Sequence, residues 1–394
     1  MPSAKTHPQQ RSFEKCRTKV AHLTSVHSAA DPRIFRKECR SLARAGFDVT
    51  VIGAGLDSAV EEEIHIRSVR KDKSRLARMT RTAWRVYRCA RSEQADIYHF
   101  HDPELIPFGL LLLIQGRRVI YDIHEDLPKD VLSKTYLPDW IRPLVSHAIR
   151  CFEDIASSRF SALVAVTPSI AHRFRSVNQR TIVVHNFPCA DELMLRHKPI
   201  AWDQREDSVA YVGGIAVTRA IHEMVSAMSL LPDGVRATLE LAGPENLDAS
   251  NSAAIRAHPG WKRVRYHGFV NQRAAFELLY RAKAGLVLYH PEPNQVESLP
   301  QKIFEYMGAG LPVVASDFPL WRRIITESGC GIVVDPLDAR EIAKAIEYVL
   351  LHPREAEEMG RRGQLAVAER FNWNTEAKKL VDLYRQIETE ICAA

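Results

Sequence analysis

The chain has 394 residues, of which 46% are hydrophobic and 26% charged, and its formal net charge is +6. This length exceeds the usual single-domain range, so we expect two domains of somewhat under about two hundred residues, each burying its own core. Seven widely spaced cysteines without a Cys-x-x-Cys pair argue against a zinc ribbon or a disulfide framework.

We expect a cytoplasmic protein. The N-terminus is polar and basic, without the apolar stretch of a secretory signal. The longest apolar run, Leu105 to Ile114, is about half the length of a membrane-spanning helix. Cysteine usage of this kind also favours a reducing compartment.

The first half of the chain alternates strand-like and helix-like patterns. Between two strand-like segments, Asp31 can cap a helix, Pro32 suits its first turn and Gly46 suits its C-terminal exit. This pattern predicts a β-α-β unit. The segments with the apolar character of buried strands are 19–26, 48–53, 95–101, 118–124, 161–167 and 181–187.

A strongly basic segment follows the second of these strands. From Arg67 to Arg91, ten Lys or Arg residues accompany a single acid, Asp72. The spacing predicts an amphipathic helix over 75–91, which suits an anionic membrane surface on the inner face of a membrane. The alternative is a packed helix with solvated arginines, and nucleic acid fits less well because few aromatics are interleaved. The apolar face would carry Leu76, Met79, Ala83, Val86, Tyr87 and Ala90, and the basic face Arg78, Arg81, Arg85 and Arg88.

The second half repeats the alternation, which predicts an α/β fold of two Rossmann-like, doubly wound domains facing a cleft. We expect an N-terminal domain over 1–190, a linker over 191–207 and a C-terminal domain over 208–370. A final helix over 371–394 follows and could pack back on the N-terminal domain. The strand-like segments of this half are 208–214, 237–243, 264–270, 284–290, 312–317 and 331–335.

The segment "ESLPQKIFEYMGAGLPVVASDFP", from Glu297 to Pro319, follows one of these strands. Ser298 and Gln301 fit a capping box, which predicts a helix from near Leu299 to about Gly308. Glu297 would then precede the helix and Glu305 would lie two turns inside it, so that both carboxylates approach one ligand.

An anion site between these carboxylates is expected at the helix start. The first-turn N–H groups, the helix dipole and Lys302 could bind a diphosphate. A nucleotide sugar has a diphosphate with hydroxyls on both sides, so it suits this arrangement. The alternative is that Glu305 and Lys302 form only a surface ion pair.

The spacing of Glu297 and Glu305, together with "LPQKIFEYMGAGLPVVASDFP", resembles the retaining glycosyltransferases of family 4, also called glycosyl transferases group 1, which have the GT-B fold. The resemblance covers nearly all of the chain and implies that the domain over 1–190 binds the acceptor and the domain over 208–370 binds the nucleotide sugar. It implies that Glu305 binds the donor ribose and Glu297 the donor sugar. It also implies that backbone amides around Ser298 and Leu299 bind the sugar and phosphate.

The segment "YVGGIAVTRAIHEMVSAM" resembles the family's strand-to-helix turn, which brings basic side chains to the diphosphate. The resemblance assigns this role to Arg219, beside the turn glycines Gly213 and Gly214. Many members carry a second basic residue after the first glycine, where this chain has Gly214. Because charge on the leaving phosphate must be neutralised, we expect Lys302 to compensate.

Further segments of both halves resemble the family. His124, which follows a strand beside Glu125, resembles the His that contacts the donor sugar. Arg33 lies in a first loop that resembles the family's "DxRIF" version and is expected to contact phosphate or acceptor. Phe269 and Val270 resemble the turn that meets the base.

The resemblance implies no cofactor and no metal. For this reason His99, His101 and Asp102, despite their ligand chemistry, are interpreted as packing or acceptor-side residues.

The resemblance implies a metal-independent hexosyltransferase that retains anomeric configuration. It would use a UDP- or GDP-linked sugar and act on a polysaccharide or lipid-linked acceptor. Two alternatives stay open: a sugar-nucleotide epimerase or hydrolase on the same fold, and a catalytically silent nucleotide-sugar-binding scaffold. A nicotinamide dehydrogenase is disfavoured because no strand is followed by G-x-G-x-x-G.

Overall fold

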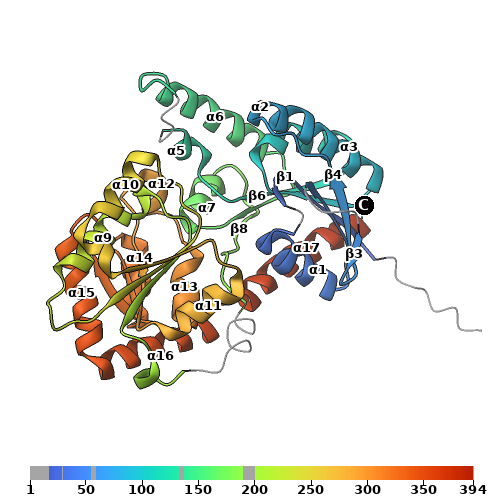
Figure 1. The fold of residues 1–394 in the computed structure, drawn as a ribbon. Coiled ribbons are helices and arrows are strands. Elements are labelled where there is room, and N and C mark those ends of the chain that lie inside the picture. Colours follow the sequence, from blue (N-terminus) through green and yellow to red (C-terminus); the bar gives the residue numbers. More distant parts are fainter. Residues whose placement is uncertain (1–16, 29, 55–58, 133–136, 190–199, 394) are drawn as a thin grey trace, which may run out of the picture. The chain divides into compact units, whose positions relative to one another are not determined.

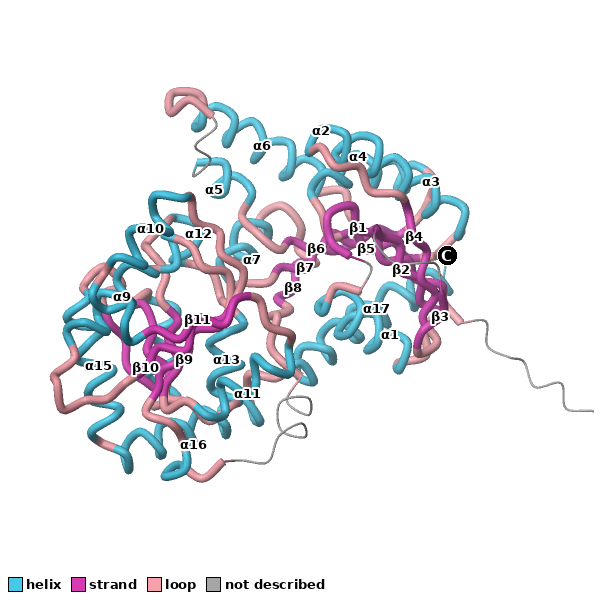
Figure 2. Tube along the Cα trace, viewed as in Figure 1, coloured by secondary structure: helices cyan, strands magenta, loops and turns pink. Residues whose placement is uncertain are grey.

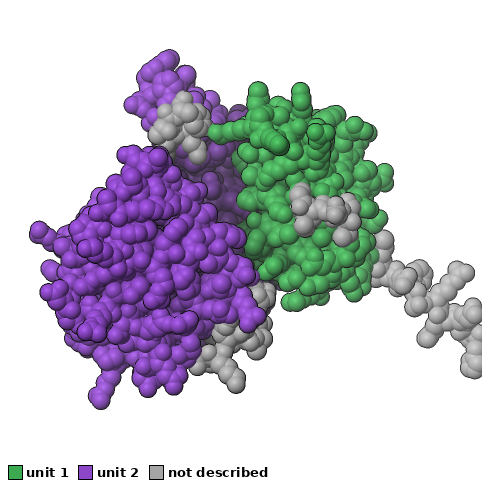
Figure 3. Space-filling view, viewed as in Figure 1, with its two compact units in different colours: residues 1–120, 383–394 green, residues 121–382 purple. Residues whose placement is uncertain are grey.

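The computed structural model describes residues 17–28, 30–54, 59–132, 137–189 and 200–393 (Figure 1). The chain forms two compact units: unit 1 comprises residues 1–120 and 383–394, and unit 2 comprises residues 121–382 (Figure 3). The predicted domain boundaries divide the chain elsewhere and remain predictions. Positions 191–199 of the predicted linker lie outside the described residues, whereas Trp202 at its end is buried in a short 3-10 helix, η4 (Trp202–Gln204).

Unit 1 is built on a sheet with the strand order β3-β4-β2-β1-β5-β6 (Figure 2). β1 pairs in parallel with β2 and β5, and β2 with β4, which confirms the predicted parallel pairing. The antiparallel hairpin of β3 and β4 is not predicted by the sequence, because acids at its turn interrupt the apolar run. The strands are β1 (Lys19–Ser28), β2 (Asp48–Ala54), β3 (Ala59–Glu61), β4 (Ile64–Val69), β5 (Ile97–Phe100) and β6 (Arg118–Ile123), of which β6 runs on into unit 2.

The first connection confirms the predicted β-α-β unit. Between β1 and β2 the chain forms η1 (Pro32–Cys39), a π-helical stretch, and α1 (Arg40–Arg44). Asp31 caps this helix, since its side chain accepts hydrogen bonds from the amides of Arg33 (2.8 Å) and Ile34 (3.1 Å). Gly46 adopts φ +93° at the exit, a conformation that favours glycine.

The basic segment is helical but not one regular helix. It comprises α2 (Arg75–Ala77), a π-helical stretch η2 (Arg78–Thr82) and α3 (Ala83–Glu93). The predicted apolar face is wrong in its first half, where Leu76 and Met79 are 74% and 42% exposed. A π-helical stretch has more residues per turn, so it shifts the phase of the 3.6-residue pattern. The second half is confirmed by the burial of Ala83, Val86, Tyr87 and Ala90.

Unit 2 continues from β6 with β7 (Ala162–Ala165) and β8 (Thr181–Val183), which pair in parallel. Its second sheet has the order β11-β10-β9-β12-β13-β14, and all of its pairings are parallel. All six strands predicted in this half are therefore present. They are β9 (Ser208–Val212), β10 (Thr238–Ala242), β11 (Val264–Gly268), β12 (Ala284–Val287), β13 (Val313–Ser316) and β14 (Gly331–Val334).

The six-stranded sheet is buried on both faces. Tyr211 of β9 packs with α9 (Ile221–Leu230) and α15 (Ala339–Leu351), whereas its neighbour Ala210 packs with α11 (Gln272–Arg281) and α13 (Gln301–Gly308). Alternate residues of a strand point to opposite faces, so a strand buried on both sides must be apolar throughout. This explains the continuous apolar runs of the sequence.

The remaining helices join these strands or cover the sheets. Those of unit 1 are η3 (Pro103–Leu105) and α4 (Ile106–Ile114). Those of unit 2 are α5 (Leu127–Leu132), α6 (Arg142–Ser157), α7 (Pro168–Arg175), η5 (Val217–Arg219), α10 (Ala249–Ala257), η6 (Pro259–Arg263), α12 (Pro293–Val296), α14 (Pro319–Ser328) and α16 (Pro353–Glu369).

The last helix, α17 (Trp373–Ala393), begins in unit 2 and ends in unit 1. Within unit 1 its Tyr384 hydroxyl lies 2.8 Å from Nδ1 of His99 and 3.3 Å from Nε2 of His22, and all three side chains are buried. Across the described part of the chain, no helix has both the length and the apolarity needed to cross a membrane.

Candidate active site

The two predicted glutamates lie between the end of β12 and the end of α13 in unit 2: Glu297 follows α12 in the connection, and Glu305 lies within α13. The predicted start of the helix is wrong, since α13 begins at Gln301 with Pro300 as its N-cap. The capping box does not form, because the Ser298 hydroxyl and amide both donate to the Gln295 carbonyl, at 2.8 and 3.0 Å. The residue before a proline is disfavoured in a helix, which explains why Leu299 stays outside. Glu305 therefore lies little more than one turn inside α13.

The side chain of Lys302, in the first turn of α13, lies against the glycine turn that follows β9. A Cβ atom added to Gly213 would lie 2.2 Å from Cε and Nζ of Lys302, so a side chain here would displace the ammonium, and the φ of +146° also favours glycine. The ammonium lies 4.7 Å from the ring centroid of Tyr211, a favourable cation–π geometry. Burial, reinforced by the charge of Arg219, lowers the pKa of Lys302 to about 8.

Arg219 is held beside Lys302. Its guanidinium lies 3.5 Å from the ring centroid of Tyr289 and donates a hydrogen bond of 3.1 Å to Oε1 of Gln295. It is half-buried at the end of η5, directly before α9. Tyr289 follows β12, the strand adjacent to β9, so the parallel pairing of these strands brings Arg219 and Lys302 to the same edge of the sheet.

Tyr211 and Tyr289 face these cations, and Tyr306 of α13 binds the backbone next to the glycine turn; the sequence does not single out any of the three. Tyr211 donates a hydrogen bond of 2.7 Å to the carbonyl of Gly214, and the amide of Val212 donates one of 2.8 Å to the hydroxyl of Tyr306. Burial raises the pKa of all three hydroxyls, so they remain neutral. In the sequence, these tyrosines appear only as aromatic residues near the ends of two strands and on a helix. Aromatic residues in such places are typical of ordinary cores, so they do not indicate a cation site.

Glu305 and Glu297 face different surroundings. Glu305 is half-buried and near the cations, where its charge acts against the lowering of the Lys302 pKa. Glu297 is exposed, pairs with Lys129 of α5 and accepts a 2.5 Å hydrogen bond from the Ser169 hydroxyl of α7. These two contacts hold the pKa of Glu297 below its usual value. The sequence does not reveal Lys129 and Ser169, which lie more than a hundred residues from Glu297.

A cavity of about 490 Å³ adjoins Glu297 within unit 2. Lys129 of α5, Glu297 and side chains of α6 and α7, among them Ser169, line this cavity. Its charges include four basic or titratable groups and two acids, so it is polar rather than strongly charged. The lining residues that carry these charges are Asp126, Lys129, Arg150, His172, Arg173 and Glu297.

The other predicted residues of unit 2 occupy a strand end and a turn. His124 is half-buried directly after β6, with Nε2 2.9 Å from Asp122, and Glu125 beside it is exposed. Phe269 is 79% exposed after β11, and Val270 beside it is half-buried. Exposed aromatic side chains are available to stack on a base, but these roles remain predictions.

Arg33 is not exposed in unit 1. It is 4% exposed and forms an ion pair of 2.9 Å with the buried Glu38. An arginine already paired with a buried carboxylate is poorly placed to take up a second anion, because leaving Glu38 would cost the stability of a buried pair. Its predicted contact with phosphate or acceptor remains a prediction.

One cluster in unit 1 has the chemistry of metal ligands. His22, His99, His101 and Glu38 each place one ligand atom within 4.8 Å of the others, and all are buried. The histidines share one face of the sheet, because His22 pairs with His99 and His101 follows two residues later. Nδ1 of His22 lies 3.0 Å from Nε2 of His101, so hydrogen bonding also accounts for the cluster.

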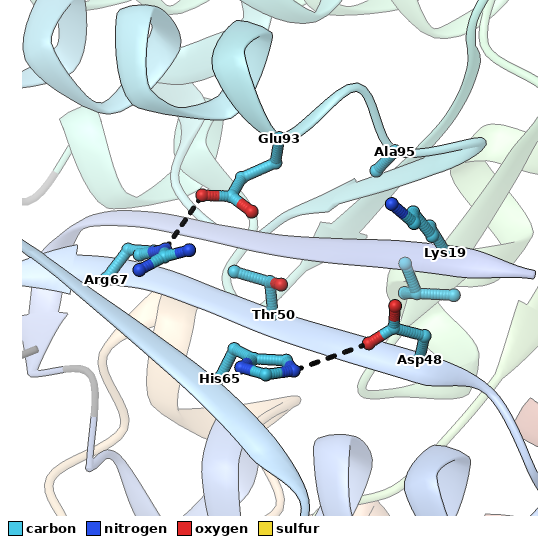
Figure 4. Close-up of a pocket in the computed structure, with 8 residues that line it drawn as sticks. Lys19, Asp48, Thr50, His65, Arg67, Glu93 and Ala95 are labelled. Carbon is cyan, nitrogen blue, oxygen red and sulfur yellow. Dashed lines mark hydrogen bonds and ion pairs between the residues drawn. The ribbon is translucent and has the colours of Figure 1, made fainter. Parts of the chain in front are cut away.

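Unit 1 also has a pocket, which opens at the amino ends of β1, β2 and β4 (Figure 4). It measures about 160 Å³, and its charged side chains pair with one another: Arg67 with Glu93 at 2.8 Å and His65 with Asp48 at 3.8 Å. Ligands of open α/β sheets bind at the carboxyl ends of the strands, which is the opposite edge.

Comparison with known proteins identifies the family. Residues 33–187 match the sequence profile "Glycosyltransferase Family 4", and residues 195–366 match "Glycosyl transferases group 1". The chain belongs to the family 4 glycosyltransferases. The glycosyltransferase is 25% identical to a glycogen synthase of Mycobacterium tuberculosis over 75% of its own length and 69% of that protein. It is 23% identical to the D-rhamnosyltransferase WbpZ of Pseudomonas aeruginosa, over 71% and 70% of the two chains.

Solved structures show the same fold. A sucrose-phosphate synthase of Thermosynechococcus elongatus superposes with a TM-score of 0.73 over 95% of this glycosyltransferase and 100% of that chain, at 19% identity. Anabaena HepE in complex with UDP-glucose superposes with a TM-score of 0.67 over 94% and 100%, at 15% identity. These likenesses confirm the predicted α/β fold with Rossmann-like domains.

The glycine turn of the glycosyltransferase gives a matched pair of variants. Gly213→Ala places a methyl group on the Lys302 ammonium and strains a backbone with φ +146°, at a cost of about 1–3 kcal/mol. We expect it to weaken nucleoside diphosphate binding by about tenfold or more. Gly214→Ala meets only Asn246 at 3.2 Å and should change binding much less. Calorimetric titration of both variants measures the difference, and equal losses would contradict the role of the lysine.

Proposed function

We propose that this glycosyltransferase moves a hexose from a UDP- or GDP-linked donor to a polysaccharide or lipid-linked acceptor, with retention of anomeric configuration and without metal. The observation that carries the proposal is the convergence of Lys302 and Arg219 at the glycine turn after β9. Two adjacent cations in a half-buried place are costly alone and favourable beside an anion of matching charge. A diphosphate is such an anion.

The relatives support a nucleotide-sugar donor. HepE is described in complex with UDP-glucose, and a trehalose-phosphate synthase of Burkholderia xenovorans, which superposes with TM-scores of 0.65 and 0.67 in two structures, is described as UDP-forming. Both proteins share the fold of this chain. Their donors suggest a UDP-linked sugar as the first to test here.

The proposed reaction breaks the bond between the donor sugar C1 and the diphosphate oxygen and forms a new bond from C1 to the acceptor oxygen. The acceptor attacks on the face that the diphosphate leaves, and a phosphate oxygen takes the acceptor proton. Lys302 and Arg219 stabilise the charge that develops on the leaving diphosphate. Glu305 would hold the ribose and Glu297 the sugar, while His124 would contact the sugar from the end of β6.

The position of Lys302 bears on the catalytically silent alternative. Family members with a basic residue in the glycine turn have a cation where this chain has Gly214. Here the Lys302 ammonium reaches the same turn from α13. A second cation therefore lies with Arg219 at this turn, which favours an active transferase over a scaffold.

The experiment that tests this function is nucleotide release from a panel of UDP- and GDP-linked sugars, with and without saccharide and lipid-linked acceptors. We expect release that depends on an acceptor, and acceptor-independent release would favour the hydrolase alternative. Glu305→Gln should lower transfer by about ten- to a hundredfold, since it removes charge-assisted hydrogen bonds worth about 1.5–3 kcal/mol. Glu277→Gln, an exposed glutamate of α11, is the matched control. Undiminished transfer by Glu305→Gln would sink the site assignment.

The lowered pKa of Lys302 predicts a pH dependence. Below about pH 8 the free enzyme carries the ammonium that a diphosphate requires, and above it the lysine becomes neutral. We therefore expect UDP affinity to be level between about pH 7 and 8, where the terminal phosphate is fully ionised, and to fall as pH rises further, with proton uptake on binding. Lys302→Arg should flatten the profile and Lys302→Met should weaken and flatten it. An unchanged slope in Lys302→Met would show that another group titrates.

We also propose that the glycosyltransferase is cytoplasmic and associates with the inner face of a membrane. In unit 1, the basic segment exposes Arg81 and Arg88 beside Leu76, Met79 and Trp84, of which Trp84 is 48% exposed. Arg78 and Arg85 are tied to Glu104 and Asp72, at 3.5 and 2.5 Å, so the other two arginines are the stronger candidates. Basic and apolar side chains on one surface suit anionic lipid.

The basic segment can be tested by vesicle co-sedimentation. Each arginine near an anionic surface contributes about 1 kcal/mol, and about 1.4 kcal/mol corresponds to a tenfold change in affinity. Arg81→Glu/Arg88→Glu should therefore reduce binding to phosphatidylglycerol vesicles by about tenfold or more at low salt. Raising the salt concentration should also weaken vesicle binding, because it screens the attraction between arginines and headgroups. Arg361→Glu/Arg362→Glu on α16 is the matched control. Binding that ignores both salt and the first pair of changes would remove this surface from the proposal.

A further inference from the structure

Four buried side chains of unit 1 place metal-ligand atoms around one point. They are His22 of β1, Glu38 of η1, His99 of β5 and His101 just after β5, and each is at most 2% exposed. One ligand atom of each lies within 4.8 Å of the other three. Three imidazoles and a carboxylate form a donor set that suits divalent transition metals.

Three of these atoms have the spacing of ligands to a single ion. Nδ1 of His22 lies 3.0 Å from Nε2 of His101, and Oε2 of Glu38 lies 3.8 and 3.9 Å from these two nitrogens. The point equidistant from all three atoms lies about 2.1 Å from each, which matches the bonds of Zn²⁺ to histidine, about 2.0–2.1 Å, and to carboxylate, about 2.0–2.2 Å. A hydrogen bond explains the contact between the histidines, and a shared ion explains the position of the carboxylate as well, since its two separations exceed hydrogen-bond distance.

The outer contacts of the cluster orient these side chains as a metal would require. The Tyr384 hydroxyl of α17 lies 2.8 Å from Nδ1 of His99 and 3.3 Å from Nε2 of His22. Histidines that bind a metal usually form a hydrogen bond through the ring nitrogen that faces away from it, so Nε2 of His99 and Nδ1 of His22 are the nitrogens directed to the ion. Arg33 pairs with Oε1 of Glu38 at 2.9 Å and so holds Oε2 toward the histidines.

We propose that these four side chains bind one divalent transition-metal ion, with Zn²⁺ the first to test, as a structural centre of unit 1. Mg²⁺ and Ca²⁺ prefer oxygen ligands, so three nitrogens disfavour both. The ion would join β1, β5 and η1 directly, and the last helix through Tyr384. Its binding energy would therefore add to the stability of the folded unit. The ligand atoms would be Oε2 of Glu38, Nδ1 of His22, and Nε2 of His99 and His101.

This ion takes no part in the proposed sugar transfer, whose phosphate site lies in unit 2. It goes beyond the absence of metal that the family resemblance implies, and it leaves the proposed reaction unchanged. The alternative is a network of hydrogen bonds among the same side chains, which would hold no metal.

Metal content tests the site in the unaltered enzyme. Enzyme produced in medium with added zinc is treated with EDTA, desalted and analysed by inductively coupled plasma mass spectrometry, and enzyme refolded with zinc is analysed in the same way. We expect about one transition-metal ion per chain, because a chelator reaches ligands this deeply buried only when the unit opens. Metal that is absent from both preparations would show that hydrogen bonding alone holds the cluster and would overturn the inference.

Two histidine variants locate the ion. His101→Gln keeps a polar side chain but removes a ligand, so most of the bound metal should be lost. His147→Gln removes an exposed histidine of α6 that lies 3.6 Å from Cys151, a pair able to hold zinc at the surface, and should leave the metal content unchanged. Equal metal contents in the two variants, or a loss confined to His147→Gln, would place the ion elsewhere and overturn the inference.

A substitution outside the ligand set measures affinity in a folded enzyme. Tyr384→Phe deletes the hydroxyl that contacts two of the histidines, so zinc affinity should fall about ten- to a hundredfold in competition with a zinc-binding dye. Tyr87→Phe is the matched control, since its buried hydroxyl accepts a 2.9 Å hydrogen bond from Gln115, and its affinity should stay within about twofold. The same affinity in both variants would contradict the proposed site.

X-ray absorption of the zinc-loaded, unaltered enzyme identifies the ligand atoms without any variant. We expect three nitrogens and one oxygen at about 2.0–2.2 Å, with outer scattering from imidazole rings. A sulfur ligand at about 2.3 Å would place the ion at a cysteine such as Cys39, which is also buried in unit 1, and would overturn the inference.

Discussion

The candidate site depends on placing two cations side by side in a half-buried position. Loss of hydration, and after it repulsion from Arg219, lowers the pKa of Lys302 to about 8. The faces of Tyr211 and Tyr289 offset part of the cost, since the cations lie 4.7 and 3.5 Å from the respective ring centroids. An arriving diphosphate would relieve the remainder, so the cost of assembling the site becomes affinity for that group.

The sheet of unit 2 makes this placement possible. β9 and β12 are adjacent and parallel, so the glycine turn after one and Tyr289 after the other meet at the same edge. Gly213 has φ +146°, and a side chain there would displace the lysine, whereas Gly243 is required because its own Cβ would lie 1.9 Å from the Gly213 carbonyl. The close contact between the backbones of Gly213 and Gly243 and the position of the Lys302 ammonium therefore depend on each other, because a wider turn would move the ammonium.

The sequence predicts the elements well, and its failures are local. Every strand-like segment became a strand, because parallel strands buried on both faces have continuous apolar runs. Asp31 was identified as a cap because side-chain capping is a short-range interaction. The start of α13 was missed since Pro300 and the turn at Ser298 compete with the capping box, and the face of Leu76 and Met79 was missed because a π-helical stretch changes the helical period.

The site itself was only partly predictable. Motif residues such as Arg219, Lys302 and Glu305 lie close together in the fold, and resemblance could find them. The supporting tyrosines and the partners of Glu297 could not be found, since Lys129 and Glu297 are 168 positions apart and only the tertiary fold joins them. Exposure is equally unreadable from sequence: the pattern of α6 fits a buried helix as well as one that carries its apolar residues outward.

The central claim concerns where the diphosphate binds, and a crystal structure with UDP or GDP tests it most directly. The account predicts phosphate oxygens within hydrogen-bond distance, about 2.7–3.2 Å, of Nζ of Lys302 and the guanidinium of Arg219, with the ribose toward Glu305. A nucleotide bound elsewhere, or phosphates that contact neither cation, would contradict it.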